Sequence, residues 1–473
     1  MRGSPTHGAL WRDPWIAAAL LAALALRLAM ARGGLWLDEA WSAVMAHDVG
    51  TPLGVLTSIN HDNNHPLNSW WLQLVGLAAP PVLARAPAIA CSVATLFPAA
   101  AFAGRRDRRS GQFAAWLFAL SPMLVLLGSE ARGYAPMLLA ATLLIDQVDP
   151  RLERPPSRLS LGLIGLLGAL GHLLMLPAIL LVALWLCGVL GWRRGLYRVA
   201  PAIIAALAVA ALLLGAARHA QGHLTIGSST PFSWTGLAGA LAELARLSVG
   251  VAPLVAIPAA LILVAPRPAR SEVMLCLLLA LAMPVAAALL HPANSHISRY
   301  FLLSTPALLW LVALRAPVVL ARPRLAALLV GALLVAMAAT DLRLIITARG
   351  EPDLPVRRIV ADQPAPAALL VGTSRLAAVV TVAAAEQRAL VTPVGPGCTP
   401  ARFLLIDLED RPPPAIITHC ATGWSLLDDR LRPYRDGAGW ALYRHAASPD
   451  DPLNIRPGLP APGPVASGPR PAL

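Results

Sequence analysis

The sequence predicts a polytopic α-helical membrane protein with about 11 transmembrane helices and a small extracytoplasmic α/β domain at its C-terminal end. The first observation is composition. The 473 residues are 57% hydrophobic and 13% charged, with a mean hydropathy of +0.64, whereas soluble domains contain about 45–50% apolar and about 25% charged residues. The second is an alternation of long apolar runs with short arginine-rich loops up to residue 342, and the third is a change to strand-length runs from residue 343.

The first apolar run, residues 14–31, has roughly the length of about 20 residues that a spanning helix needs. The segment ARGGLWLDE after it lacks a convincing small-residue cleavage site, so we expect a spanning helix and not a cleaved signal peptide. Later apolar runs predict helices at residues 84–104, 111–128, 134–147, 159–171, 173–190, 196–216, 250–266, 272–290, 300–315 and 325–342.

The arginines predict the orientation of these helices. The net charge is +13 and the chain contains no lysine. Because cytoplasmic loops carry the excess of basic residues, we place five short arginine-rich loops in the cytoplasm: residues 105–109, 151–158, 191–198, 266–270 and 315–324. Four segments that are longer or poorer in arginine are then expected outside: residues 32–83, 128–134, 217–249 and 291–299. This dispersed charge does not indicate nucleic-acid binding.

One apolar segment, residues 67–80, does not fit as a spanning helix, because spanning would move the later arginine-rich loops outside. We therefore expect an interfacial helix there, inside a first outer loop of residues 32–83, with Trp70 and Trp71 at the membrane surface. The whole transmembrane region is residues 1–342, with a cytoplasmic N-terminus.

From residue 343 the pattern predicts an extracytoplasmic α/β domain that ends near residue 445. Strand-length runs and one helical run alternate with Pro, Gly and Asp turns: strands at 367–372, 403–408 and 415–420, and a helix at 374–387. Outside the cytoplasm, Cys398 and Cys420 could form a disulfide or remain free. Residues 446–473 are rich in proline and glycine and are expected to be disordered.

Ionisable and polar residues from several separate segments fall on the predicted outer side. Charged groups near hydrocarbon are costly and usually mark function. Taken singly, each has an ordinary explanation: solvated charge at a helix end, a surface histidine, or an arginine that anchors at the interface. Metal binding by the loop histidines is the less expected outcome. The convergence on one side of the membrane is the signal, and the residues are Asp38, Glu39, His61, Asp62, Asn64, His65, Arg85, Arg132, Tyr134, Arg299 and Tyr300.

A carboxylate and several arginines beside the membrane suit glycosyl transfer from a lipid-phosphate-linked sugar. The carboxylate takes the proton of an acceptor hydroxyl, and guanidinium groups bind the phosphate of the leaving polyprenyl phosphate. The sequence has no D-x-D motif, no dinucleotide-binding glycine motif and no P-loop. We therefore expect the donor in the membrane and not a nucleotide sugar.

Four ordered segments resemble the GT-C superfamily of membrane glycosyltransferases: LWLDEAWSA, NHPLNSWWLQLVG, LARAPAIACSVATLFPAAAFAGRR and ALSPMLVLLGSEARGYAPMLLA. The nearest relatives are the family-39-like enzymes, which include protein O-mannosyltransferases, lipid A aminoarabinose transferases and bacterial mannosyltransferase-like proteins. The resemblance covers roughly residues 14–147, and SRYFLLSTPALL at 298–309 is similar to a later motif. It does not reach residues 343–473.

The resemblance implies roles for the residues that match its motifs. Asp38 would be the catalytic base, with Glu39 assisting it or contacting the acceptor. His65 and Pro66 match an H-P-P-L motif in which Leu67 replaces the second proline, and Gly128 stands where an arginine or aromatic residue is often present. The residues expected to face the donor phosphate are Arg85, Arg132, Tyr134, Arg299 and Tyr300, and those of the acceptor or donor loop are His61, Asp62, Asn64 and His65. The reaction would invert the anomeric centre, and no metal or other cofactor is expected.

The expected function is transfer of a sugar from a polyprenyl-phosphate donor to a lipid, glycan or protein acceptor, on the outer face of a bacterial inner membrane. The alternative from another class is a polytopic transporter or lipid flippase, whose ionisable residues should line a path through both leaflets. A third reading is a non-catalytic scaffold descended from such an enzyme. The predicted helix interiors carry almost no charge, which favours the first reading.

Overall fold

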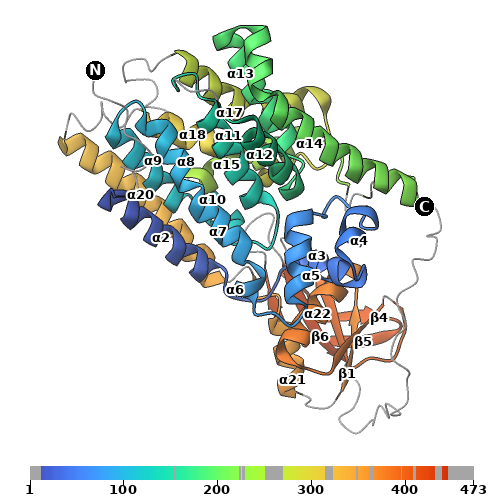
Figure 1. The fold of residues 1–473 in the computed structure, drawn as a ribbon. Coiled ribbons are helices and arrows are strands. Elements are labelled where there is room, and N and C mark those ends of the chain that lie inside the picture. The colour runs from blue at the N-terminus through green and yellow to red at the C-terminus, as the bar shows by residue number, and fades with distance from the viewer. Residues whose placement is uncertain are drawn as a thin grey trace.

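The computed structural model describes residues 12–152, 156–222, 225, 229–250, 270–314, 323–347, 350–362, 366–395, 397–408, 412–431 and 439–445. It is mainly helical, with a six-stranded sheet at the C-terminal end (Figure 1). The helices before the sheet domain are α2 (Pro14–Met30), α3 (Leu37–Asp48), α4 (Pro52–Thr57), α5 (Pro66–Val75), α6 (Pro81–Ala84), α7 (Ala86–Ala94), α8 (Leu96–Gly104), α9 (Arg108–Leu120), α10 (Pro122–Leu127), α11 (Tyr134–Val148), α12 (Arg158–Gly171), α13 (Met175–Leu190), α14 (Trp192–Gln221), α15 (Trp234–Val249), α17 (Arg270–Leu290), the 3₁₀ helix η2 (Ser298–Phe301), α18 (Ser304–Ala313) and α20 (Pro323–Thr347).

Three described helical stretches are long and apolar enough to cross a membrane: Ala86–Gly104, Trp192–His219 and Ser271–Leu290. In the last two, only 28% and 22% of the most apolar window is buried inside the protein, so their apolar side chains need lipid around them. Shorter apolar helices are Pro14–Met30, Tyr134–Val148, Arg158–Gly171, Met175–Leu190 and Ser304–Ala313. These features indicate a membrane protein. The helix predicted at residues 250–266 lies outside the described residues.

The predicted helix at 111–128 is interrupted, because Pro122 has no N–H and ends α9. This leaves the carbonyl of Phe118, four residues earlier, without its intrahelical donor. Arg27 of α2, fully buried, fills that role: Nη2 donates to Phe118 O at 3.2 Å and Nη1 to Ala119 O at 3.0 Å. Its Nε donates to Ser92 Oγ at 2.7 Å. Arg27 therefore secures the break between α9 and α10.

The first outer loop is more helical than predicted, since α3, α4, α5 and α6 occupy most of residues 32–83. The predicted helix 67–80 corresponds to α5, which begins with Pro66 in its first turn and ends at Gly76, whose φ of 78° is favourable for glycine. Trp70 and Trp71 lie on α5 and donate from their indole N–H groups to backbone carbonyls of Pro52 and Leu83. Helix α15 was not predicted.

The C-terminal domain contains α21 (Leu354–Asp362), β1 (Ala367–Val371), α22 (Ser374–Gln387), β2 (Val391–Val394), β3 (Phe403–Asp407), β4 (Ile416–His419), β5 (Thr422–Arg430) and β6 (Trp440–His445). The strand order is β2-β1-β3-β6-β5-β4, with β1 parallel to β2 and β3 and the other pairs antiparallel. The predicted strands and helix of this domain are confirmed, and Cys398 and Cys420 form a disulfide with a Cα–Cα distance of 5.4 Å. The tail predicted to be disordered, residues 446–473, lies outside the described residues.

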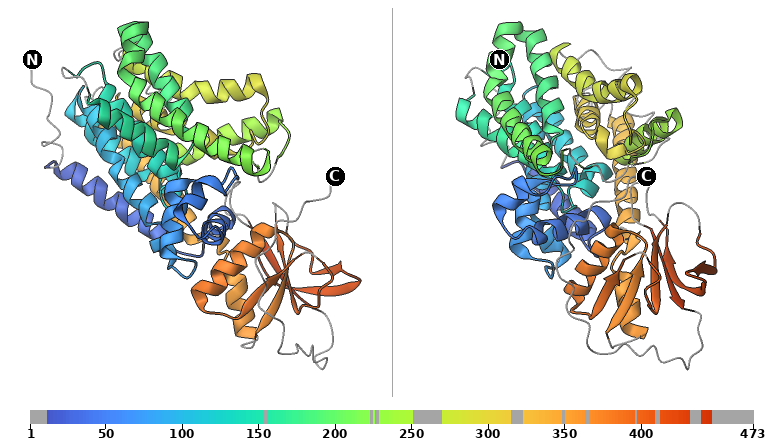
Figure 2. Two further views of the ribbon diagram at one scale, coloured as in Figure 1. Left: turned by 45° about the vertical axis from the view of Figure 1, so that its right-hand side comes forward. Right: turned by 90° about the vertical axis from the view of Figure 1, so that its right-hand side faces the viewer.

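Helix α3 packs into the core of the C-terminal domain. Figures 1 and 2 show α3 and α5 between the helix bundle and the sheet domain. One buried apolar cluster contains Trp36, Ala40 and Ala43 of the first outer loop together with Val379 and Ala383 of α22. The first outer loop and the C-terminal domain therefore share one buried apolar core.

Candidate active site

Two adjacent carboxylates begin α3. Asp38 and Glu39 lie in its first turn, where the helix dipole favours negative charge. Glu39 Oε2 accepts the backbone N–H of Trp36 at 3.1 Å, which closes the N-terminus of the helix. Both carboxylates are buried, with 7% of Asp38 and none of Glu39 exposed. Asp38 and Glu39 are thus buried inside the protein and are not solvated charges at a helix end.

Glu39 pairs with Arg85. Arg85 Nε donates to Glu39 Oε1 at 2.8 Å and Nη2 to Oε2 at 2.5 Å. The other Arg85 donors reach the carbonyls of Ala31, Gly33 and Gly34 just after α2, at 2.7–2.9 Å. Both side chains are fully buried, and buried charges are stable only when paired and hydrogen-bonded. Arg85 and Glu39 therefore form a buried structural pair, and their predicted roles toward phosphate and acceptor stay predictions.

Asp38 has different partners. Its Oδ2 accepts from Arg132 Nη1, and from Arg299 Nη2 at 2.8 Å. Arg132 lies between α10 and α11, and Arg299 lies on η2 just before α18, so three segments far apart in the sequence meet here. The guanidinium carbons of Arg132 and Arg299 lie 5.8 and 5.2 Å from the ring centroid of Trp36. We call Asp38, Arg132, Arg299, Trp36 and Tyr134 the Asp38 cluster.

The charge state of Asp38 follows from these neighbours. Burial acts to raise its pKa, but the guanidinium groups of Arg132, Arg299 and Arg375 outweigh burial and hold the pKa below its ordinary value. Asp38 is therefore a carboxylate at neutral pH.

His65, the residue before α5, contacts Arg132, with 3.3 Å between His65 Nε2 and Arg132 Nη2. Because a guanidinium only donates, Nε2 accepts and the imidazole carries its proton on Nδ1. The ring of His172 stacks on His65 at 4.6 Å and lies 4.6 Å from the ring of Tyr134. Burial and the nearby arginines lower the pKa of His172 to about 3, and burial, His172 and Arg132 lower the pKa of His65 well below its ordinary value. Both imidazoles are neutral.

Sequence reasoning missed His172. It is the polar residue at the turn between α12 and α13, in an otherwise apolar stretch. The predicted cytoplasmic loops 151–158 and 191–198 flank this helical hairpin, so its turn belongs on the outer side with the other candidates. That position was the available signal.

The other predicted loop residues, His61, Asp62 and Asn64, contact neighbours in the first outer loop. His61 is 8% exposed and its ring lies 4.2 Å from that of Trp41. The Asp62 Oδ1 atom lies 2.8 Å from His61 Nδ1. Asn64 braces the loop, since its Nδ2 donates to Val55 O at 2.7 Å. These three residues shape the loop that carries His65.

Tyr300 follows Arg299 on η2. Burial raises the pKa of its hydroxyl to about 12. Asn63, which adjoins the predicted loop residues, holds α3 in place by donating from Nδ2 to Asp38 O and Ser42 Oγ, each at 2.8 Å.

Several polar atoms of the Asp38 cluster are buried without a hydrogen-bond partner among the described residues: Trp36 Nε1, Arg132 Nε and Tyr134 OH. Each buried polar group that lacks a hydrogen-bond partner costs about 1–3 kcal/mol of stability. All three can donate, so an anionic ligand would satisfy them. Within the described parts of the chain, no group of His, Cys, Asp or Glu has the arrangement of a metal site.

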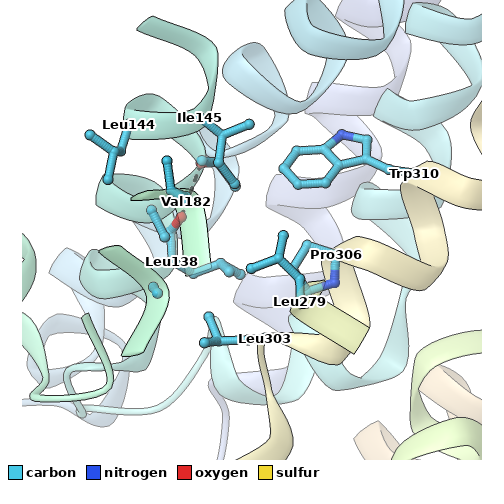
Figure 3. A pocket seen from close by; sticks show the side chains of 11 residues that line it. Leu138, Leu144, Ile145, Val182, Leu279, Leu303, Pro306 and Trp310 are labelled. Atoms are coloured by element: carbon cyan, nitrogen blue, oxygen red, sulfur yellow. Dashed lines mark hydrogen bonds between the residues drawn. The ribbon is translucent and has the colours of Figure 1, made fainter. Parts of the chain in front are cut away.

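An apolar cavity lies one helical turn from this cluster. Side chains of α11, α13, α17 and α18 line it, among them Leu138, Val182, Leu279, Leu303 and Trp310 (Figure 3). Leu138 is four residues, about 6 Å along the helix, from Tyr134, and Leu303 is four residues from Arg299. Apolar side chains therefore follow the charged cluster within about one helical turn.

In comparisons with known proteins, no family model and no curated protein matches this chain.

Proposed function

We propose that the chain is an integral membrane glycosyltransferase of GT-C type, which moves a sugar from a polyprenyl-phosphate donor to a lipid, glycan or protein acceptor. The single observation that carries this proposal is the meeting of Asp38 with Arg132 and Arg299 at one carboxylate oxygen. It unites a base and two phosphate-binding cations from three separate segments. The proposed location is the outer face of a bacterial inner membrane, with about 11 spanning helices and a cytoplasmic N-terminus.

In the proposed reaction, an acceptor hydroxyl attacks the anomeric carbon as Asp38 takes its proton. The new C–O bond forms while the bond from the anomeric carbon to the phosphate oxygen breaks, and polyprenyl phosphate leaves with that electron pair. The attack inverts the anomeric centre. Arg132 and Arg299 stabilise the charge that develops on the phosphate.

The donor also prepares the base. In the unliganded site Arg132 and Arg299 neutralise Asp38, which makes it a weak base. A donor phosphate competes for the same guanidinium donors, and Arg132 Nε and the Tyr134 hydroxyl have hydrogen bonds to offer it. As the arginines turn to the phosphate, the basicity of Asp38 rises at the moment when a proton must be taken.

The alternative, a transporter or lipid flippase, is favoured by one observation. Asp341 of α20 is fully buried, and neither of its carboxylate oxygens has a hydrogen-bond partner among the described residues. A carboxyl inside a membrane helix is a usual mark of an ion path. The described charges otherwise gather near helix ends, so we rank transport second.

The test of the proposed function is Asp38→Asn, with Asp48→Asn as the matched control. Asp48 is the last residue of the same helix and is exposed. We expect Asp38→Asn to insert normally and to lose about 10²–10⁴-fold in the rate of sugar transfer to an extracted acceptor, while Asp48→Asn keeps the wild-type rate. Wild-type transfer by Asp38→Asn would reject Asp38 as the base.

A further inference from the structure

The C-terminal domain reaches the candidate active site. Asp353 Oδ1, just before α21, accepts the backbone N–H of Gly34 at 2.9 Å. A Cβ at Gly34 would lie 2.5 Å from Asp353 Cβ, so only glycine permits this approach. Together with the apolar cluster shared by α3 and α22, this contact fixes the first turn of α22 relative to Asp38.

That first turn carries Arg375. Its guanidinium carbon lies 4.9 Å from the ring centroid of Trp41, which is three residues after Asp38 and so on the same side of α3. Arg375 donates no hydrogen bond to any described residue, unlike Arg85, Arg132 and Arg299, although its charge acts on Asp38. It is a positioned cation with its donors available.

The first turn of α22 adds a second source of donors. The side chain and carbonyl of Thr373 accept the N–H groups of Leu376 and Ala377. The N–H groups of Ser374 and Arg375 precede these and have no intrahelical acceptor. The backbone and the guanidinium therefore offer an anion several donors from one place.

Arg375 lies on a different part of the fold from Arg132 and Arg299, and this difference indicates which ligand each would bind. Arg132 and Arg299 directly precede the apolar helices α11 and α18, and the cavity wall continues from them. Arg375 lies in the first turn of α22, in the C-terminal sheet domain. The polyprenyl chain of a donor must stay in hydrocarbon, so an anion at Arg375 belongs to the other substrate.

We propose that Arg375, held by Trp41, forms an acceptor subsite that takes a phosphate group carried by the acceptor near the hydroxyl to be glycosylated. This inference rests on the proposed function, because only a sugar-transferring enzyme has an acceptor. Binding of an anion at Arg375 can nevertheless be tested without sugar transfer. It makes the C-terminal domain a part of the active site.

The experiment uses the full chain in phosphatidylcholine nanodiscs and measures its thermal stability during titration with three probes. Phosphatidic acid in the nanodisc supplies a lipid phosphate, glycerol 3-phosphate supplies a soluble phosphate, and diacylglycerol is the uncharged control. We expect one of the phosphates, and not diacylglycerol, to raise the Tm. Response to the lipid assigns a lipid acceptor, and response to the soluble probe assigns a soluble one.

Variants locate the site. Arg375→Ala should weaken the apparent affinity for the responding phosphate about tenfold or more, while Arg388→Ala, at the exposed far end of the same helix, should not change it. A response lost in Arg132→Ala but kept in Arg375→Ala would place the phosphate in the donor site and overturn the inference. So would equal stabilisation by diacylglycerol, or no response to any probe.

Failure of this inference can be told from failure of the proposed function, because Asp38→Asn should bind the responding phosphate at least as well as the wild type. Loss of phosphate binding in Arg375→Ala together with wild-type sugar transfer in Asp38→Asn would keep the anion site and remove the base. Unchanged phosphate binding in Arg375→Ala together with lost sugar transfer in Asp38→Asn would keep Asp38 as the base and reject the anion site at Arg375.

Discussion

Two charge clusters at opposite ends of α11 differ in how their arginines are paired. Beyond the C-terminal end of α11, Arg105, Arg106 and Arg151 pair with Asp146, Asp149 and Glu272, a set that we call the Arg105 cluster. At the N-terminal end lies the Asp38 cluster. The helix between them has 15 residues, or about 22 Å.

The two clusters differ in their pairing. In the Arg105 cluster three guanidinium groups meet three carboxylates, and the pairs tie α8, α11 and α17 together. In the Asp38 cluster two guanidinium groups share one oxygen of Asp38, the buried carboxylate of Glu130 acts on Arg132 and Tyr134, and some buried donors lack a partner among the described residues. The donors without a partner, Trp36 Nε1, Arg132 Nε and Tyr134 OH, are the groups that an anion could bind. We therefore assign a structural role to the Arg105 cluster and propose a functional one for the Asp38 cluster.

The sharpest way to break this comparison is to remove one arginine from each cluster. Arg132→Ala or Arg299→Ala should lower the transfer rate per folded molecule about 10²–10³-fold, because we propose that each binds the leaving phosphate. Arg105→Ala should leave that rate unchanged and reduce the yield of folded protein. The measurement is donor-dependent transfer, normalised to the monodisperse fraction on size exclusion. Unchanged donor dependence in the Arg132 and Arg299 variants would remove their phosphate role.

The neighbouring pair Glu39–Arg85 should respond as a structural pair. Arg85→Ala leaves a buried carboxylate and the carbonyls after α2 without donors, so we expect a loss of about 3–5 kcal/mol in stability. Thermal unfolding of the purified variant measures it. Arg32→Ala is the control, since Arg32 is exposed and, among the described residues, donates only to Ala29 O close by. A stable Arg85→Ala protein with weakened donor use would support the phosphate role.

Domain docking should depend on Gly34. Gly34→Ala brings a methyl group against Asp353 and should cost about 1–3 kcal/mol as overpacking does, with faster proteolysis between the bundle and the C-terminal domain. Gly162→Ala is the matched control, because a Cβ there meets nothing within 4 Å. Equal protease resistance in both variants would show that the close approach is not needed for docking.

The stacked histidines predict a pH dependence of stability. The pKa values of His65 and His172 lie below their ordinary value in the folded protein, so the unfolded chain takes up more protons below about pH 6.5. Their contribution is complete above that pH and is lost as pH falls, by up to about 1.4 kcal/mol per pH unit for buried His65. Asp38 does not contribute in this window, because its pKa is lowered from an already acidic value.

Thermal unfolding between pH 7 and pH 5 measures this effect. His172→Leu should flatten the dependence of Tm on pH, and His47→Gln, which changes an exposed histidine of α3, should not. A wild-type Tm that stays constant over this range would contradict the neutral stacked pair.

Much of the fold was predictable where local pattern and final environment agree. The helix at 374–387 and the strand at 403–408 were found within a residue, since their apolar runs are bounded by turn residues. Helix α3 was missed because Asp38 and Glu39 are polar residues at buried positions, so its pattern does not have the apolar stripe of a helix. Helix α15 was missed although Glu243 and Arg246 pair across one of its turns.

In the site, residue types pointed to Asp38, Arg132 and Arg299 as a group, because charge beside hydrocarbon is rarely placed without use. The same reasoning included Arg85 and Glu39 and could not separate them, since pairing depends on which atoms meet. It also passed over Arg375, which is 337 residues after Asp38 in the sequence (375 − 38). Arg375 belongs to a domain in which the sequence shows no recognisable motif.

By itself, the sequence determined the apolar helices and the change to a sheet domain at its C-terminal end, because hydropathy acts on each segment separately. Only the tertiary structure decided that Asp38 faces two arginines while Glu39 is satisfied by a third, that His172 stacks on His65, and that α22 brings Arg375 to α3. Those outcomes depend on distances between segments remote in the chain, and buried charge is settled by its nearest neighbours rather than by its position along the sequence.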